Sequence, residues 1–397
     1  MKWTNKGHEF DRIGNFFKNK KLLIYGLGEL GQYVFDNIVK HNLQVDAFAD
    51  RNQRYIENGY CGHRVYHVDD IYYNRNIGEN YLIIVCFVEE HKDVVMRRLE
   101  QSGYINGVDF IYWSNFLNTE IEQIYAWYAA NKLIISSLCL VPSTACNLRC
   151  KGCLNFSPYF KTESNITYDL QYLYNEADLI FEWCDYTPRF QVSGGEPLLY
   201  KDLDKILVYL DVKYRDKIER LEIVTNGTIL PDSKLLSTLK EHNIFVYLDD
   251  YTIQNPTFKK SHNMVANLLD KNGIEWSDNK VEEWFYLDID NTDHSCWTEK
   301  ELIDFRDECG NPWNNIEDGK LYFCNFAKFA SKAGLYDIDK NDYYDLTNYS
   351  ENKKIEILEF TLGYSEKGYT NFCKNCSGWE NLNKKRIPVA EQQYNIK

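Results

Sequence analysis

The chain has 397 residues, of which 44% are hydrophobic, so it is long enough for two or three domains with ordinary cores. Its formal net charge is −14 and no strongly basic block stands out, which argues against nucleic acid as the main partner, because phosphate binding needs clustered lysine and arginine. Since no apolar run has membrane-spanning length and the N-terminus lacks the apolar core of a signal peptide, we expect a cytoplasmic protein with no membrane partner.

The first predicted element is a strand over residues 21–25, followed by Gly26-Leu-Gly28-Glu-Leu-Gly31 and a helix that runs to about His41. A second strand, residues 44–49, ends at Asp50. Glycines at this spacing let a helix N-terminus hold a phosphate, and an acid at Asp50 can reach a ribose hydroxyl. The same glycines can serve only a tight turn and close helix packing, so the pattern leaves ligand binding open.

Residues 20–115 resemble the small Rossmann-type domain attached to bacterial glycan-synthesis enzymes, including the nucleotide-sugar-binding part of some sugar acyltransferases. The resemblance implies a Rossmann-like domain over residues 1–115 that binds a nucleotide or nucleotide-sugar through Gly26, Gly28, Gly31 and Asp50. Residues 116–132 are predicted to form a linking helix.

Strands and helices then alternate over residues 133–290, which predicts an α/β unit with parallel strands. Catalytic groups in such units gather at the carboxyl ends of the strands. The expected strands lie near residues 134–141, 189–193, 221–225, 244–248 and 283–289, and the expected helices near 167–184, 202–216, 232–242 and 257–272.

Three close cysteines follow the first of these strands, in the run Cys146-Asn-Leu-Arg-Cys150-Lys-Gly-Cys153. Twelve cysteines without a secretion signal indicate a reducing compartment, where thiols bind metal. Cubane iron–sulfur clusters normally take four thiolates, so three thiols leave one iron with an open position, as a catalytic metal site does. A zinc site or simply buried thiols are the alternatives, but a zinc site needs a fourth ligand, and no second cysteine pair lies close in sequence.

The CxxxCxxC loop, together with Gly194-Gly195-Glu196-Pro197 at the end of the next strand, resembles the radical S-adenosylmethionine (SAM) superfamily. The resemblance implies an open, partial (β/α)6 barrel whose [4Fe–4S] cluster, held by Cys146, Cys150 and Cys153, binds SAM. One departure is Gly152, because the residue before the third cysteine is usually an aromatic near the adenine in this superfamily. The residues implied to contact SAM are Gly194, Gly195, Glu196, Pro197, Thr225, Asn226 and Asp249.

A second set of cysteines lies beyond the barrel. Cys309 and Cys324 bracket a predicted hairpin whose turn is Asp318-Gly319, and Cys373-Lys-Asn-Cys376 can grip metal from one turn. Four thiols suffice for one closed cluster, and a structural zinc site is again the alternative.

This second pattern resembles the auxiliary-cluster extension of radical SAM enzymes, in its shortened twitch form rather than the full SPASM form. The resemblance implies a second [4Fe–4S] cluster in a small domain over residues 291–380, followed by a tail over 381–397. Cys296 lies in the connection to this extension. It is a tentative hydrogen donor to a substrate radical, although an unused or structural thiol is the simpler interpretation.

The resemblance implies an enzyme that generates a 5′-deoxyadenosyl radical and takes hydrogen from a small-molecule substrate, with a flavodoxin or ferredoxin as electron donor. The expected substrate is a sugar, a nucleotide-sugar or a related alcohol, and the expected reaction a net oxidation by a radical SAM oxidoreductase. Sugar epimerisation, maturation of a ribosomal peptide, and a non-catalytic binding or sensing role are the alternatives. The N-terminal Rossmann-like domain favours the small molecule, because peptide maturases usually carry a winged-helix domain there.

Overall fold

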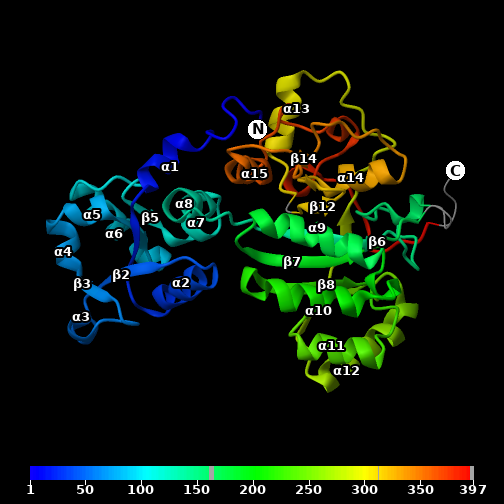
Figure 1. The fold of residues 1–397 in the computed structure, drawn as a ribbon, viewed down its shortest axis with the longest axis horizontal. Coiled ribbons are helices and arrows are strands. Elements are labelled where there is room, and N and C mark those ends of the chain that lie inside the picture. The colour runs from blue at the N-terminus through cyan, green and yellow to red at the C-terminus, as the bar shows by residue number, and fades with distance from the viewer. Residues whose placement is uncertain (161–164, 312, 394–397) are drawn as a thin grey trace. The chain divides into compact units, whose positions relative to one another are not determined.

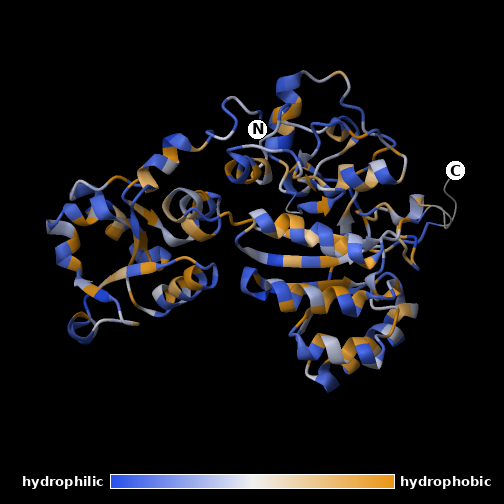
Figure 2. Cartoon of the chain, in the orientation of Figure 1, coloured by the Kyte–Doolittle hydropathy of each residue, from blue (hydrophilic) through white to orange (hydrophobic). Residues whose placement is uncertain are grey.

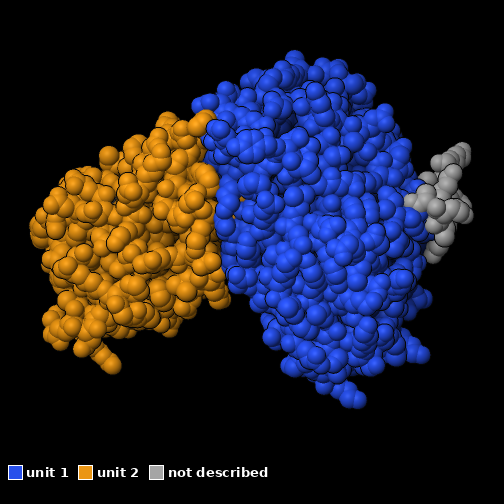
Figure 3. All heavy atoms as spheres, in the orientation of Figure 1, with its two compact units in different colours: residues 1–7, 135–397 blue, residues 8–134 orange. Residues whose placement is uncertain are grey.

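The computed structural model describes residues 1–160, 165–311 and 313–393. Contacts divide the chain into two compact units (Figure 3): a small unit of residues 8–134, and a large unit of residues 1–7 and 135–397. Residues 394–397 of the expected tail lie outside the described residues. None of the described helices is both long and apolar enough to cross a membrane.

A five-stranded parallel sheet forms the centre of the small unit, within the residues described there, in the order β3-β2-β1-β4-β5. This is the Rossmann strand order as far as its fifth strand. The central strands β1 and β4 are almost wholly buried, as expected of strands covered on both faces. The strands are β1 (Lys21–Tyr25), β2 (Val45–Asp50), β3 (Arg64–His67), β4 (Tyr81–Val85) and β5 (Phe110–Tyr112).

Helices surround this sheet, and the longest two, α2 and α6, follow β1 and β4. The region 116–132, expected as a linking helix, corresponds to the end of α7 and to α8, which pack within the small unit. The helices are α1 (Asp11–Phe17), α2 (Glu29–Lys40), α3 (Gln53–Asn58), α4 (Val68–Tyr73), α5 (Asn76–Asn80), α6 (Glu89–Gln101), α7 (Trp113–Leu117) and α8 (Ile121–Ala130).

The large unit contains, among its described residues, an eight-stranded sheet in the order β10-β9-β8-β7-β6-β12-β13-β14 (Figure 1). The neighbours from β10 to β12 run parallel, and the α/β architecture of a partial barrel is thereby confirmed. The sheet strands are β6 (Leu138–Ser143), β7 (Thr187–Gly194), β8 (Ile218–Thr225), β9 (Phe245–Asp250), β10 (Trp276–Lys280), β12 (Asn315–Glu317), β13 (Lys320–Tyr322) and β14 (Tyr344–Asp345).

Four helices connect the barrel strands close to the predicted positions: α9 (Leu170–Trp183), α10 (Leu203–Tyr214), α11 (Ser233–Glu241) and α12 (Lys259–Asn272). An aspartate caps α9 and α11, since Asp169 and Asp232 accept hydrogen bonds from amides of the first turn. Hydrophobic and hydrophilic residues alternate along these helices (Figure 2), which matches helices with one face on the sheet.

One predicted barrel strand is wrong. Of residues 283–289, only β11 (Glu283–Phe285) is a strand, and it pairs antiparallel with β15 (Arg386–Pro388) outside the barrel. The edge strand of the barrel is instead β10, whose polar residues Trp276-Ser-Asp-Asn-Lys280 gave no apolar signal. An edge strand needs fewer apolar side chains because one side of its backbone has no partner strand.

The predicted hairpin between Cys309 and Cys324 is confirmed. Strands β12 and β13 pair antiparallel, with Glu317 opposite Lys320. Asp318 and Gly319 both have positive φ, 55° and 67°, as a tight two-residue turn requires. Because β12 also pairs with β6, this hairpin continues the barrel sheet. The remaining helices are α13 (Glu299–Asp307), α14 (Asn325–Lys332) and α15 (Lys353–Thr361).

Candidate active site

A cavity of about 460 Å³ opens at the carboxyl ends of the barrel strands, and Cys146, Cys150 and Cys153 line it together. Its volume is in the range of small-molecule sites. Gly194, Gly195, Asn226 and Asp249, which were expected at a SAM site, line the same cavity. The structure thus brings together residues from the ends of four neighbouring strands.

The two glycines of the GGEP turn let it pass directly beneath the start of the cysteine loop. A β-carbon on Gly195 would lie 2.0 Å from the carbonyl oxygen of Ala145, and one on Gly194 would lie 2.4 Å from that of Ser143. The Gly195 amide donates to the Ser143 carbonyl at 3.0 Å. The close approach therefore requires glycine, and the turn supports the loop that carries the cysteines.

The cysteine sulfurs are partly buried and receive hydrogen bonds. The Leu148 amide donates to Cys146 Sγ at 3.4 Å, and Gln392 Nε2 donates to Cys150 Sγ at 3.1 Å. Burial raises the pKa of Cys146 to about 12 and that of Cys150 above its usual value. A buried thiolate needs a compensating cation, and a bound metal centre supplies one.

The C-terminal segment covers the cysteine loop, which the sequence did not predict. Residues 386–393, the C-terminal strap, pair with β11 and then form a bridge between Gln392 and Cys150. Both polar atoms of the Gln392 side chain bind the cysteine loop. Its Oε1 accepts a hydrogen bond from the Arg149 amide at 2.9 Å, and its Nε2 donates one to Cys150 Sγ. Val389 and Ala390 of the strap are fully buried.

Glu196 is buried and its carboxylate binds protein groups. Oε1 accepts from Thr225 Oγ1 at 2.8 Å and from the Leu198 amide at 3.1 Å, and Oε2 accepts from the Asn226 amide at 2.9 Å. Burial raises its pKa to about 7 against the lowering effect of these bonds. Glu196, Thr225 and Pro197 do not belong to the described residues that line the cavity. Glu196 therefore joins the ends of β7 and β8.

Asp249 at the end of β9 faces the cavity. Tyr251 Oη donates to Oδ2 at 2.8 Å and Asn279 Nδ2 to Oδ1 at 2.7 Å. Burial raises its pKa to about 6 despite these bonds. A carboxylate in this position can accept hydrogen bonds from a ligand hydroxyl or amine.

Cys309, Cys324, Cys373 and Cys376 converge in the large unit. Their thiols lie close enough to act on one another electrostatically, and burial raises the pKa of Cys324 to about 12. Cys324 caps α14, because its sulfur accepts from the Ala327 amide at 3.5 Å.

The spacing of both cysteine sets bears on zinc. In the described part of the chain, no three cysteine sulfurs lie within 4.8 Å of one another. A tetrahedral zinc ion with Zn–S bonds of about 2.3 Å needs sulfurs about 3.8 Å apart. As they lie in this structure, the thiols are spaced more widely than the ligands of one zinc ion.

A buried guanidinium lies beside the four thiols. Arg306 lowers the pKa of Cys324 and Cys373 through its charge and stacks over Phe323 with its carbon 4.3 Å from the ring centroid. Within the described ranges, Arg306 has no ion pair with a carboxylate. Its charge is thus available to an anionic group at the thiols, as a cluster with four thiolates is.

Cys296 is exposed, and it is not among the described residues of the cavity wall. Its neighbours His294 and Trp297 stack with ring centroids 3.7 Å apart at a separate surface depression. The cavity contains another thiol instead, that of Cys139 on β6. The apolar sequence around Cys139 indicated only a core residue.

In the small unit, the structure brings the glycine turn and Asp50 together. Asp50 accepts hydrogen bonds from the Leu27 amide at 2.7 Å and the Asn52 amide at 2.8 Å, so its carboxylate closes the turn. A β-carbon on Gly31 would lie 1.8 Å from the Gly26 carbonyl oxygen, whereas nothing lies within 4 Å of one on Gly28. Gly31 therefore serves helix packing, and Gly28 borders open space.

The cavity wall contains residues that sequence reasoning missed: Cys139, Arg189, Gln191, Asn315 and Asn325. A signal for two of them exists in β7, where Arg189, Gln191 and Ser193 alternate with the buried Phe190 and Val192. Asn315 and Asn325 had no such signal. The position of Asn315 depends on the pairing of β12 with β6, and Asn325 is the first residue of α14.

Comparison with known proteins gives one family and several solved structures. The family described as the radical SAM superfamily matches residues 140–266. No curated protein matches the chain. Among solved structures, anSMEcpe with bound AdoMet is 26% identical, over 36% of this chain and 43% of its own, with a TM-score of 0.31.

Two further structures have lower sequence identity. BtrN in complex with AdoMet and 2-DOIA is 19% identical over 62% of this chain and 94% of its own, with a TM-score of 0.39. SuiB of Streptococcus suis bound to S-adenosylmethionine is 17% identical over 47% of this chain and 44% of its own, with a TM-score of 0.28. The chain thus spans less than half the length of anSMEcpe and SuiB. The matched residues 140–266 hold both the three-cysteine loop and the GGEP turn, and over these residues the chain is similar to the radical SAM superfamily.

Proposed function

We propose that the protein is a radical SAM oxidoreductase that oxidises an alcohol of a small molecule to a carbonyl group. One hydrogen atom leaves the carbon, and the hydroxyl hydrogen leaves as a proton to solvent when the substrate radical gives up one electron. The observation that carries this proposal is the composition of one cavity wall. Three thiols line it, and Asn325 and Trp379, which line it too, lie close in sequence to Cys324 and Cys376 of the four-thiol set. A substrate in this cavity would lie within reach of both cysteine sets.

The residues present fit the cofactors that the superfamily implies. Cys146, Cys150 and Cys153 would hold the cluster that binds SAM, and Cys309, Cys324, Cys373 and Cys376 a second cluster. When bound, the reduced first cluster with SAM supplies a 5′-deoxyadenosyl radical that takes hydrogen from a C–H bond, and the second supplies an acceptor for one electron. The first cluster would receive its own electron from a flavodoxin or ferredoxin.

The task of the protein is to position the ligands and exclude water. Gly194 and Gly195 expose backbone at the cavity wall, and Asn226 and Asp249 offer polar groups for the amino and ribose parts of SAM. Trp284, Trp313 and Trp379 add large apolar surface to the same cavity. Such walls hold a substrate in a reactive orientation and keep water from the reacting carbon.

One observation favours sugar epimerisation as a second candidate. An epimerase returns a hydrogen atom to the substrate, and the thiol of Cys139 lies in the cavity wall beside Ser193, with Sγ and Oγ 3.2 Å apart. We retain oxidation as the main proposal, because it uses the four-thiol site. Peptide maturation and a non-catalytic sensing role have no comparable support from a particular residue.

The small unit suits a second ligand. We propose a nucleotide or nucleotide-sugar at the turn of Gly26, Gly28 and Gly31, since the space beside Gly28 is open and α2 begins at Glu29.

The test begins with protein reconstituted with iron and sulfide without air. With SAM and dithionite it should form 5′-deoxyadenosine. Changing Cys146, Cys150 and Cys153 together to alanine should abolish this activity and lower iron and sulfide from about eight each per chain to about four. Formation of 5′-deoxyadenosine by the triple variant would refute the assignment.

Turnover in heavy water separates oxidation from epimerisation. Oxidation should give a product two hydrogens lighter, with no deuterium fixed at carbon. A product of unchanged composition that carries one deuterium would establish epimerisation. Loss of that deuterium in Cys139→Ala, but not in Cys296→Ala, would identify the donor.

A further inference from the structure

The side chains of Gln191, Cys139 and Asn315 form a row along the cavity wall. Gln191 on β7 is in register with Cys139 on β6, and Cys139 is in register with Asn315 on β12. Registered residues of parallel strands point to the same face of a sheet, and all three line the cavity. The strand order β7-β6-β12 makes this row continuous.

A buried carboxylate fixes the orientation of the first amide. Glu222 is fully buried, and its Oε1 accepts from Gln191 Nε2 at 2.8 Å. Arg189 and Arg220 also donate to Glu222, at 2.6 and 2.8 Å. A carboxylate held by two guanidinium groups only accepts hydrogen bonds, so it binds the NH2 end of the amide. The carbonyl oxygen of Gln191 accepts a long contact from the Cys139 thiol, with sulfur and oxygen 4.0 Å apart, and keeps its second lone pair for a donor in the cavity.

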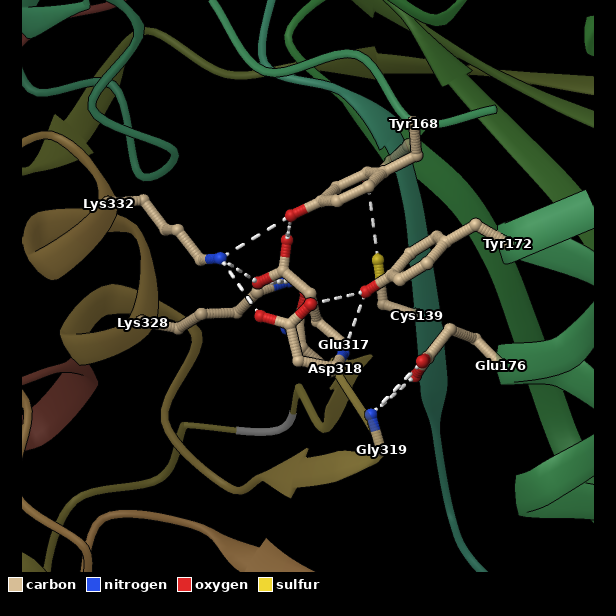
Figure 4. Close-up of polar contacts among 11 residues, drawn as sticks. Cys139, Tyr168, Tyr172, Glu176, Glu317, Asp318, Gly319, Lys328 and Lys332 are labelled. Atoms are coloured by element: carbon tan, nitrogen blue, oxygen red, sulfur yellow. Dashed lines mark hydrogen bonds and ion pairs between the residues drawn. The ribbon is translucent and has the colours of Figure 1, made fainter. Parts of the chain in front are cut away.

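A buried ammonium fixes the second amide in the opposite sense. Lys328 is 1% exposed, and its Nζ lies 3.4 Å from Glu317 Oε2 and 3.5 Å from Asn315 Oδ1. Figure 4 shows Lys328 and Lys332 approaching Glu317 and Asp318 from α14. Because an ammonium only donates, it binds the carbonyl end of Asn315. The NH2 group of Asn315 is left as a donor for the cavity.

A third amide faces the same space. Asn325 is 6% exposed and lines the cavity, and its buried Oδ1 has no hydrogen-bond partner within the described residues. A buried acceptor without a partner is costly, so it indicates a ligand that donates to it. These three amides therefore offer two acceptors and one donor to the cavity, all of them uncharged.

The charges of the wall oppose an anionic ligand. Arg189 is the single cationic side chain among the described residues that line the cavity, and its guanidinium is already paired with Glu222. Asp249 and Glu283 line it as well. A phosphate is normally bound by several cations, and two carboxylates repel it.

We infer that the cavity takes an uncharged polyhydroxylated small molecule, whose hydroxyl groups donate to Gln191 and Asn325 and accept from Asn315. Hydroxyl groups fit this wall because each one both donates and accepts. Lys328 is a positioning residue, which acts on the substrate through Asn315. The inference rests on the proposed function and narrows it, since it excludes phosphorylated sugars and nucleotide-sugars from this cavity.

The first experiment uses the reconstituted full chain and a panel of cyclitols, hexoses and alditols, with the same hexoses as 6-phosphates and UDP derivatives. Two readouts are measured: stimulation of 5′-deoxyadenosine formation, and the change in tryptophan fluorescence, which reports binding without turnover. Neutral polyols should stimulate and bind, and their phosphorylated forms should do so at least about tenfold more weakly. Equal or stronger effects of the phosphorylated forms, or no effect of any neutral polyol, would overturn the inference.

The two proposals fail in different ways. No 5′-deoxyadenosine in any arm, including SAM alone, would remove the proposed function and the inference that rests on it. Normal 5′-deoxyadenosine formation with a preference for anionic sugars would overturn only the inference.

A second experiment tests Lys328 with Lys332 as its matched control. Both lysines contact Glu317, but in the described structure only Lys328 contacts Asn315. Lys328→Met should raise the KM of the best polyol about tenfold, with iron content and SAM affinity unchanged, whereas Lys332→Met should shift KM less than about twofold. Equal KM shifts in both variants, or a loss of iron in Lys328→Met, would mean a structural role and would overturn the assignment.

Discussion

Glu196 illustrates how a single side chain can serve a site without lining it. Its carboxylate binds Thr225, the Leu198 amide and the Asn226 amide, and so holds Asn226 at the cavity wall. The resemblance to the superfamily predicted a direct contact of Glu196 with the SAM ammonium. Support of Asn226 would affect ligands with or without the ammonium group, whereas a direct contact would affect only ligands that carry it.

Glu196→Gln should therefore weaken 5′-methylthioadenosine as well as SAM, each by about tenfold, because the amide NH2 would face hydrogen-bond donors and displace Asn226. Equilibrium dialysis with the reconstituted protein measures both affinities. 5′-Methylthioadenosine lacks the α-amino group of the methionyl part of SAM, so a loss of affinity confined to SAM would instead support the direct contact. Iron content verifies that the cluster is retained.

Arg306 lies beside the four thiols, where its charge should affect the midpoint potential of a bound cluster. Removing a buried positive charge disfavours the more negative, reduced form of a neighbouring cluster, so Arg306→Gln should lower its midpoint potential. Arg306→Lys keeps the charge and should stay close to the wild-type potential. A redox titration followed by electron paramagnetic resonance makes the comparison. Equal potentials in all three proteins would show that Arg306 acts only through its packing on Phe323.

At the scale of elements, the C-terminal strap and the cysteine loop form one structural unit. Gln392→Leu removes both side-chain bonds to the loop and should speed iron release from the three-cysteine site to a chelator by about tenfold. Gln393→Leu is the matched control, because Gln393 meets the loop through its backbone amide, which donates to the Arg149 carbonyl at 2.7 Å. Similar release rates in the two variants would argue against the proposed support.

Helix α9 and the β12–β13 turn are joined by a titratable contact. Buried Glu176 accepts from the Gly319 amide at 3.0 and 3.1 Å, and burial raises its pKa from 4.5 to about 7 (Figure 4). The folded protein thus binds this proton more tightly than the unfolded chain does. The stabilisation is complete below a pH of about 4.5 and is lost as the pH rises through about 7.

Glu176→Gln, which is neutral at every pH, should remove this loss. Relative to wild type, its stability should rise by on the order of 1–3 kcal/mol between about pH 5 and about pH 8. Thermal unfolding without air at several pH values measures the difference. Glu182→Gln, at an exposed position of the same helix, should show the same change of stability with pH as wild type. If the stability of Glu176→Gln changed with pH in the same way as that of wild type, the prediction would be contradicted.

Local signals predicted some elements and missed others for physical reasons. The helices α9 to α12 and the Asp318-Gly319 turn follow from periodicity and turn chemistry, which act over a few residues. Strand β10 is polar and carried no local signal. Strand β11 was predicted as a strand, but its partner β15 lies near the C-terminus, far away in sequence, so its place outside the barrel had no local signal. The same holds for the amide wall, because Asn315 reaches the cavity only through the pairing of β12 with β6.

For the whole molecule, the division into two units makes the small unit testable by itself. Residues 8–134 include α8, which packs against α1, so this fragment should fold where a fragment cut before α8 would not.

Gly31→Ala should destabilise the small unit strongly, because the new methyl group meets the Gly26 carbonyl. Gly28→Ala should fold like wild type and, if the proposed nucleotide binds there, reduce its affinity. Circular dichroism measures the unfolding temperatures, and calorimetry measures the nucleotide affinity. Equal unfolding temperatures for the two variants would contradict the packing argument.

The strap also determines when the first site can be completed during synthesis. Cys150 and Gln392 are 242 residues apart, so the cysteine loop leaves the ribosome long before its cover exists. At 5–20 residues per second, that interval is about 10 to 50 s. Throughout it the three thiols belong to an unfinished nascent chain, open to oxygen and to stray metal ions. Iron delivery in the cell must therefore follow translation of the strap, or protect the bare loop until the strap has been made.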